Sequence, residues 1–395
     1  MNQDFELKHK TKGSEKFVET FLGRLEEITL AQGLHPGMLI AIIANRNYHG
    51  MDIPSSIING PNYYLDWETK DDPVIVGEAL KRIKRGKIII DPAERYPIGE
   101  FILQYNFVRG FRPLRGAQLE DVKLDQEFGN PKFHYGLPTV DPEVFDTVNQ
   151  ESGVEISLIF NRYPFAPYHF LWVPNRKIEN KHNQYLDPDE DGHLIEAAWD
   201  FVTNSGLGGG IRLCYNSNGA HASVNHLHFQ GFFLTQGWEP PFEKILEKRR
   251  SEILGAVPEE GLVLNGEKVR AKDIRYKIDQ SGPIDCYFPG TRWISKRDGV
   301  GALKDFIGEM NKRYANGEKV AFNLYMTPEG AACFPRKHQA DKSYFELIKD
   351  SPFTTGYAFS EMIAEIICPN VGVSIFGQDK TEKRIREIYQ AASLG

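Results

Sequence analysis

The chain has 395 residues, of which 41% are hydrophobic and 26% charged, a composition typical of a globular protein with two or three domains. Its formal net charge of −7 excludes general binding to nucleic acid or to an anionic membrane. The four cysteines are widely spaced without a C-x-x-C pair. The N-terminus has no apolar core of signal-peptide length, and no apolar run is long enough to span a membrane. These features predict reduced thiols in a cytoplasmic protein.

The first third of the chain predicts one helix and one strand. Apolar residues at helical spacing predict an amphipathic helix over residues 14–32. Residues 45–75 are rich in Gly, Pro, Asn and Asp, which indicates turns. A strand is expected over residues 98–108, and a basic loop with three arginines over residues 109–116.

The middle of the chain predicts a compact α+β unit with an antiparallel meander. A helix with an acidic first turn is expected over residues 187–204, before the glycine cluster at 206–210. Strands are expected on both sides of this helix, at residues 154–161, 168–174, 211–217 and 224–234.

A second and looser α+β pattern follows residue 240. Helices are expected at 240–250, 343–350 and 359–367, a strand at 287–295, and a hairpin at 321–337. We therefore expect an α+β protein of two halves, each an antiparallel sheet with packed helices, over residues 1–245 and 246–395.

The stretch NHLHFQGFF, residues 225–233, carries the clearest chemical signal. Its polar residues His226, His228 and Gln230 recur at every second position among apolar neighbours. Alternation at period two predicts that all three side chains leave one face of a strand. The apolar flanks indicate that this face lines a site.

A neutral His228 would be a suitable nucleophile toward phosphorus near neutral pH. His226 could then hold the leaving oxygen or the neighbouring phosphate, and Gln230 could donate a hydrogen bond without adding charge. The loop upstream offers small donors and close backbone amides to phosphate oxygens. These are Asn216, Ser217, Asn218, Gly219 and Ser223.

The same spacing has two other interpretations. Two histidines on one strand face also form a familiar metal pair, which would need a further ligand from elsewhere in the chain. Alternatively, both are core histidines with satisfied hydrogen bonds. Cys214 on the preceding strand is interpreted as a core residue, and His169 as structural in the sheet.

Residues 211–234 resemble the active-site segment of the GDP-hexose phosphorylases, in the galactose-1-phosphate uridylyltransferase branch of the histidine-triad (HIT) superfamily. In that branch glutamine replaces the third histidine of the triad, as Gln230 does here. The segments at 159–174, 101–116 and 321–339 resemble other parts of these enzymes, in order. Asn225 and Leu227 stand where the uridylyltransferases have prolines, which favours the phosphorylases.

The resemblance implies two HIT-like halves, with catalysis in the N-terminal one. His228 would become nucleotidylated, supported by His226 and Gln230. Asn161 would bind the nucleotide, and further residues would bind nucleotide or phosphate. These further residues are Gln104, Asn106, Arg109, Arg212, Asn216, Ser217, Gly219, Ser223 and Lys337.

The predicted reaction splits a nucleoside diphosphate sugar, with a GDP-hexose favoured, by phosphate to give a nucleoside diphosphate and hexose 1-phosphate. The alternatives are an Ap4A-type dinucleoside polyphosphate phosphorylase, a hexose-1-phosphate nucleotidylyltransferase, and a metal enzyme with His226 and His228 as ligands. No cofactor or metal is required. The expected partners are small molecules, neither nucleic acid nor membrane, and the interpretation allows a homodimer.

Overall fold

The fold is seen in a computed structural model of the chain. It describes residues 6–31, 36–59, 81, 90–106, 122–128, 133–177, 182–255, 262–264, 267–269, 282–284, 286–349, 357–368 and 378–394.

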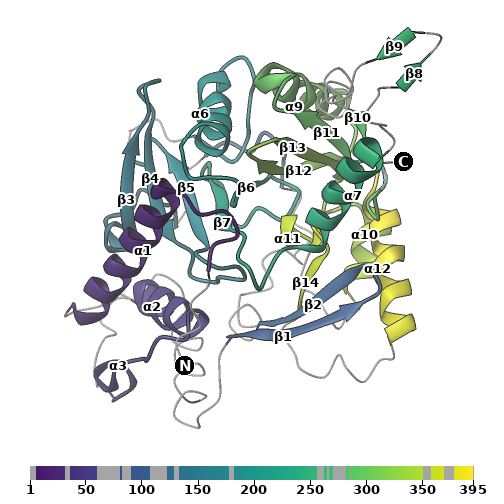
Figure 1. The fold of residues 1–395 in the computed structure, drawn as a ribbon. Helices are drawn as coiled ribbons and strands as arrows, with labels where there is room; N and C mark the ends of the chain where they lie inside the picture. Colours follow the sequence, from purple (N-terminus) through teal and green to yellow (C-terminus); the bar gives the residue numbers. More distant parts are fainter. Residues whose placement is uncertain are drawn as a thin grey trace.

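A nine-stranded antiparallel sheet runs through the centre of the molecule (Figure 1). Its strands in spatial order are β10 (Gly282–Pro283), β11 (Arg292–Ser295), β13 (Gly330–Lys337), β12 (Val320–Thr327), β6 (Ile211–Asn216), β7 (Phe229–Phe233), β5 (Phe170–Pro174), β4 (Glu155–Phe160) and β3 (Val144–Asn149). Antiparallel pairing of β6 with β12 joins five strands of the N-terminal part to four of the C-terminal part. The predicted α+β class with antiparallel sheets and packed helices is confirmed.

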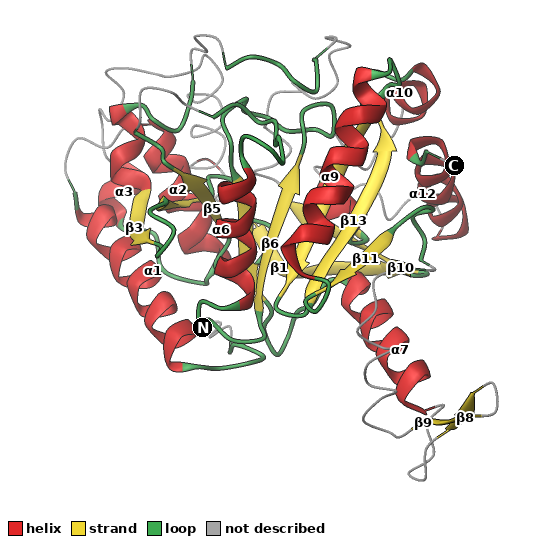
Figure 2. Ribbon diagram, turned by 90° about the horizontal axis from the view of Figure 1, so that it is seen from above, coloured by secondary structure: helices red, strands yellow, loops and turns green. Residues whose placement is uncertain are grey.

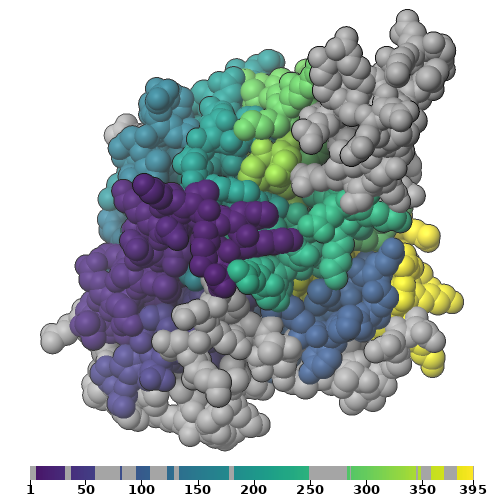
Figure 3. Space-filling view, viewed as in Figure 1, coloured from purple at the N-terminus to yellow at the C-terminus, as the bar shows by residue number. Residues whose placement is uncertain are grey.

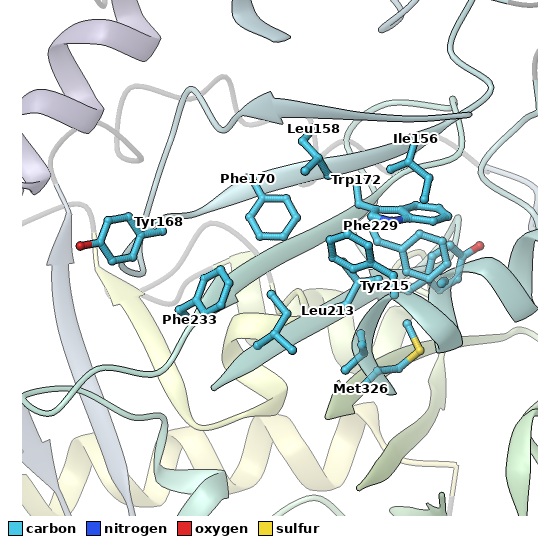
Figure 4. Close-up of a cluster of buried hydrophobic side chains, with 14 of the residues drawn as sticks. Ile156, Leu158, Tyr168, Phe170, Trp172, Leu213, Tyr215, Phe229, Phe233 and Met326 are labelled. Atoms are coloured by element: carbon cyan, nitrogen blue, oxygen red, sulfur yellow. The ribbon is translucent and has the colours of Figure 1, made fainter. Parts of the chain in front are cut away.

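Two helices, α6 (Gly192–Thr203) and α9 (Gly299–Ala315), cover one face of this sheet (Figure 2). Alternate residues of each strand point toward the helices, and most of these residues are apolar. Figure 4 shows rings and aliphatic side chains from β4 to β7 gathered there, including Trp172, Tyr215 and Phe229. Leu303 and Phe306 of α9 belong to the same core.

Helices α1 (Lys12–Leu30) and α2 (Pro36–Tyr48) pack beside the β3 end of the sheet, with the short α3 (Ser55–Asn59) and the 3-10 helix η1 (Pro138–Glu143) nearby. Thr11 and Ser14 cap the start of α1 reciprocally, and Phe17, Phe21 and Leu25 form its buried face. The helix predicted at 14–32 is present. The turns predicted over 45–75 are wrong for residues 45–48 and 55–59, which are helical.

A smaller sheet lies against the other face of the large one. It consists of β1 (Ile90–Ile98), β2 (Phe101–Asn106) and β14 (Glu365–Cys368), and β14 runs parallel to β2. The helix predicted over 359–367 is therefore wrong in its second half, because α11 (Phe359–Met362) ends before β14 begins. Pairing with β2, far away in the sequence, overrides the local helical pattern.

The remaining described elements are three helices and a hairpin. They are α7 (Pro241–Gly255), α10 (Lys342–Lys349), α12 (Gln378–Ala392) and the hairpin β8 (Leu262–Leu264) to β9 (Glu267–Val269). Residue 245 lies inside α7, and β14 from the C-terminal part completes a sheet with β2 from the N-terminal part. The division into halves at residue 245 stays a prediction.

The N-terminal segment lies across the surface toward α7, as the purple atoms of Figure 3 show. The backbone amide of Lys8 donates to the carbonyl of Leu234 at 3.1 Å, and the Lys8 ammonium pairs with Glu239. This segment thus pairs with the residues that directly follow β7. No helix in the described ranges has the length and apolarity needed to cross a membrane.

His49 gives the fold a dependence on pH. Burial lowers the pKa of His49 from its ordinary value of 6.5 to about 3, because the interior disfavours the charged ring. The unfolded chain binds a proton between these values while the folded chain does not. The contribution of His49 to the free energy of unfolding is therefore fully present above pH 6.5. It is lost as the pH falls toward 3, by at most about 1.4 kcal/mol per pH unit.

We expect His49→Gln to reduce this loss, because an amide can still accept the hydrogen bond from the Tyr168 backbone, which is 3.4 Å long in the wild type. Urea unfolding at about pH 7 and about pH 4 measures the difference for wild type and variant. Equal losses in both proteins would contradict the assignment to His49.

Candidate active site

The second face of the nine-stranded sheet carries polar side chains where the first carries the core. Ile211, Leu213 and Tyr215 belong to the helix-covered core, so Arg212, Cys214 and Asn216 point to the opposite face. Cys214 is directly opposite Gln230, and Asn216 is directly opposite Asn323. Directly opposite residues share a face. Strand geometry therefore places the Gln230 and Asn216 side chains together on the face that looks toward the smaller sheet.

The sequence predicts His226 and His228 within a strand, but in the structure both precede it. Strand β7 begins at Phe229, so only Gln230 of the three alternating polar residues is within the ladder. The segment before β7 pairs with a loop instead of a strand, since the Leu227 amide donates to the carbonyl of His182 at 2.8 Å. The predicted start of the strand at residue 224 is wrong for this reason.

The two histidines are buried and are held in opposite tautomers. His228 Nδ1 lies 2.8 Å from the carbonyl oxygen of His226, which can only accept, so Nδ1 carries the proton. His226 Nδ1 accepts from the backbone amide of Tyr135 at 3.1 Å, so its proton resides on Nε2 when the ring is neutral. A neutral His228 thus offers a lone pair at Nε2, while a neutral His226 offers an N–H at the same position.

Aromatic side chains that the sequence interpretation missed pack around this pair. The Tyr135 ring centroid is 5.1 Å from that of His228 and 5.7 Å from that of His226. Phe128 meets His226 edge to face at 5.4 Å, and the His134 ring is 6.1 Å from it. The cluster of aromatic residues at 133–135 was the available signal, but nothing in the sequence placed it beside residue 226.

The side chains of Asn161 and Gln230, which the sequence assigns to one site, are in contact. The Asn161 amide donates to Gln230 Oε1 at 3.3 Å, and it lies 3.0 Å from His169 Nε2. Because its oxygen accepts from Asn161, the amide nitrogen of Gln230 keeps its two N–H groups for other partners. His169 is completely buried and accepts at Nδ1 from the Phe165 amide, which agrees with a structural role.

The loop after β6 is fixed by the C-terminal part of the chain. Asn216 Oδ1 accepts from Asn323 at 2.6 Å and from the amide of Phe359 at 2.9 Å. Ser217 Oγ accepts from the Phe322 amide at 2.9 Å. Gly219 has a φ of +78°, and Ser223 is exposed at the end of the loop.

Gln104 and Asn106 of β2 support the turn that follows Asn161. Gln104 donates to the Phe165 carbonyl at 2.7 Å and to Glu365 at 2.9 Å, and Asn106 donates to the Pro164 carbonyl at 2.9 Å. Both side chains are completely buried. Their contacts place them behind the Asn161 turn, so a direct contact with a nucleotide stays a prediction.

Two of the predicted basic residues have partners within the protein. Arg212 forms a buried ion pair with Glu243, through Nε at 2.6 Å and Nη2 at 3.0 Å. It is four residues from Asn216 along β6, which is about 13 Å in a strand. The Lys337 ammonium lies 3.3 Å from Ser343 Oγ. Arg109 lies outside the described residues, and the phosphate-binding roles of all three basic residues stay predictions.

The structure bears on the interpretation of Cys214 as a core residue and on the interpretation of the two histidines as metal ligands. Burial raises the pKa of the Cys214 thiol well above its usual value, which agrees with a core residue. Within the described ranges the structure gathers no group of three or more His, Cys, Asp or Glu side chains suited to a metal ion.

Comparison with known families identifies the segment that carries this geometry. Residues 100–232 match the model of the GDPGP1-like, N-terminal domain. The resemblance to GDP-hexose phosphorylases predicted from the sequence is thereby confirmed. The matched residues include β2 to β6, most of β7 and both histidines.

Two relatives share sequence with this region. GDP-D-glucose phosphorylase 1 of Danio rerio is 29% identical over 136 residues, which are 34% of this chain and 36% of that protein. GDP-D-glucose phosphorylase 1 of Bos taurus is 28% identical over 194 residues, 43% of this chain and 47% of that protein. The chain thus spans less than half the length of each relative.

Among solved structures, the chain is similar to yeast Ap4A phosphorylase Apa2. The complex with Ap4A has a TM-score of 0.45 and 12% identity, over 82% of this chain and 97% of that one. The complex with AMP has a TM-score of 0.46 and 11% identity, over 82% and 96% of the two chains.

Gly219 offers a test of how tightly the loop is held. A Cβ at this position would lie 2.0 Å from His338 Cδ2, and the His338 ring also contacts the Val122 carbonyl at 2.6 Å. Gly219→Ala therefore combines an unfavourable left-handed conformation with displacement of a buried ring. We expect a loss of unfolding free energy about 1–2 kcal/mol larger than from conformational strain alone.

Gly153→Ala is the matched control, because Gly153 has a φ of +81° and no atom within 4 Å of the added Cβ. Urea unfolding of both variants separates the steric effect from the backbone effect. Equal destabilisation of the two variants would show that the His338 contact does not constrain the loop.

Proposed function

We propose that the protein is a nucleotide-sugar phosphorylase that splits a GDP-hexose with inorganic phosphate. The opposite tautomers of His226 and His228 carry this proposal. One neutral ring presents a nucleophilic nitrogen and its neighbour presents a hydrogen-bond donor, which suits attack on a phosphate whose oxygens must be stabilised. The match of residues 100–232 to the GDPGP1-like model supports the GDP-hexose class.

In the first step His228 Nε2 attacks the α-phosphorus of the nucleotide sugar. A P–N bond forms, and the bond from that phosphorus to the bridging oxygen breaks, which releases hexose 1-phosphate. The His226 N–H and the Gln230 amide donate to oxygens that gain charge in the transition state. The His226 carbonyl stabilises the positive charge on the His228 ring through the Nδ1 proton.

In the second step an oxygen of inorganic phosphate attacks the same phosphorus. The P–N bond breaks, GDP leaves, and His228 returns to its neutral form with the lone pair on Nε2. The two substitutions need the same donors, so one site serves both. We propose that Asn161 orients the nucleotide and that the backbone around Gly219, with Ser217 and Ser223, receives the phosphates.

The proposed partners are a nucleotide sugar and phosphate, and we propose a cytoplasmic location. The buried thiols of Cys214, Cys333 and Cys368 support a reducing compartment. The proposal also allows a homodimer.

His228→Ala tests the mechanism directly. Loss of the nucleophile should lower kcat roughly a thousandfold or more, because only positioning and phosphate stabilisation remain. Gln230→Ala should lower it about a hundredfold, the usual effect of one lost oxyanion donor. His193→Ala on α6 is the control, because His193 is exposed on the helix-covered side of the sheet.

Turnover is measured with a panel of GDP-sugars, ADP-sugars and Ap4A, together with acid-labile label trapped on the protein. Label on wild type and none on His228→Ala is the expected result. Near-full activity of His228→Ala would refute the covalent mechanism, and phosphorolysis of Ap4A alone would identify the other substrate class. Stoichiometric zinc or iron that is lost in His228→Ala would favour a metal enzyme.

A further inference from the structure

Gln184, in the loop between β5 and α6, forms a bridge that neither the sequence interpretation nor the proposed mechanism uses. Its side chain is completely buried. Its Oε1 accepts from the His228 amide at 2.9 Å, and its Nε2 donates to the His228 carbonyl at 3.0 Å. The second N–H of the same nitrogen donates to the Asn216 carbonyl at 2.8 Å. Both hydrogens of this amide are therefore used.

This arrangement replaces a neighbouring strand for one residue. His228 precedes β7, so the ladder with β6 does not hold its backbone. The side-chain amide of Gln184 bonds both the N–H and the C=O of His228, as a paired strand residue would. His228 thus keeps an ordered backbone where the sheet hydrogen bonds have ended.

Gln184 is itself held from two directions. The Tyr215 hydroxyl donates to its carbonyl at 3.0 Å, and its own amide donates to Asn225 Oδ1 at 3.0 Å. Asn225 in turn donates to the carbonyls of Gln126 and Glu127 at 3.1 and 2.8 Å. The bridge is therefore anchored both to β6 and to the segment that precedes the aromatic cluster.

We infer that Gln184 is a positioning residue that sets the His228 imidazole relative to the loop beginning at Asn216. One amide contacts the backbone of the proposed nucleophile and of the residue that leads into the proposed phosphate-binding loop. It therefore fixes the distance between attacking nitrogen and phosphate donors. It also maintains the bend that lets His228 Nδ1 reach the His226 carbonyl. This inference rests on the proposed function of His228.

The test compares Gln184→Met with wild type. Methionine has a similar length but neither donates nor accepts strong hydrogen bonds. We expect kcat for the GDP-hexose to fall about a hundredfold, the cost of a small misplacement of a catalytic group. KM should change by less than about threefold, because Gln184 has no proposed contact with substrate. The readout is kcat at a temperature where the variant is folded.

Gln150→Leu is the matched control. Gln150 also uses its side-chain amide to bond a backbone carbonyl, that of Ala197 at 2.9 Å, and it lies on the β3 side of the sheet. Its kcat should stay at the wild-type value. If Gln184→Met does not fold, Gln184→Glu serves instead, because a carboxyl group keeps the size and an acceptor but cannot donate to both carbonyls.

Imidazole NMR provides a second readout that needs no turnover. Long-range ¹H–¹⁵N spectra, with His228→Ala to assign the signals, report which His228 nitrogen carries the proton. Wild type should show the proton on Nδ1, and the Gln184 variant should show a mixture of tautomers. If wild type turns over no nucleotide sugar, the proposed function fails, and this spectrum alone decides the positioning role. A folded variant with kcat within about threefold of wild type would overturn the inference.

Discussion

The hydrogen bond from His228 Nδ1 to the His226 carbonyl is the constraint on which the chemistry of this site depends. A neutral imidazole has one nucleophilic nitrogen, and which one it is follows from the partner of the other. The bond joins residues only two apart, so it requires a particular course of the backbone between them. A regular strand would direct the residue 226 carbonyl across to a neighbouring strand. Because β7 begins only at Phe229, this carbonyl is available for the local bond.

The C-terminal part of the chain supports this N-terminal site. Asn323 on β12 and the start of α11 both donate to Asn216, and His338 covers Gly219. The antiparallel pairing of β6 with β12 brings these groups into reach. Two sheets with separate cores would not hold the loop in this way, so the shared sheet is part of the architecture of the site.

The sequence predicted what depends on local pattern. Apolar periodicity located α1, α6 and the strands from β4 to β6, and the spacing of His226, His228 and Gln230 located the site. The same spacing predicted that the two histidines lie within a strand, which is wrong. Alternation alone does not show at which residue the hydrogen bonds to neighbouring strands begin.

Contacts between segments that are distant in the chain could not be predicted from the sequence. Gln184 and Tyr135 lie 44 and 91 residues from the histidines whose backbone or ring they bond. No periodicity links such positions. The strand β14 was missed for the same reason, since its residues read as a continued helix until β2 is placed beside them.

The parallel pairing of β2 with β14 has a consequence for how the molecule is made. The hydrogen bond between Gln104 and Glu365 spans 261 residues, and both side chains are completely buried. Closing so long a loop is entropically unfavourable and slow compared with local folding. During synthesis the ribosome must release residue 365 before β2 can pair with β14, so the support behind the Asn161 turn forms long after β2 itself has been made.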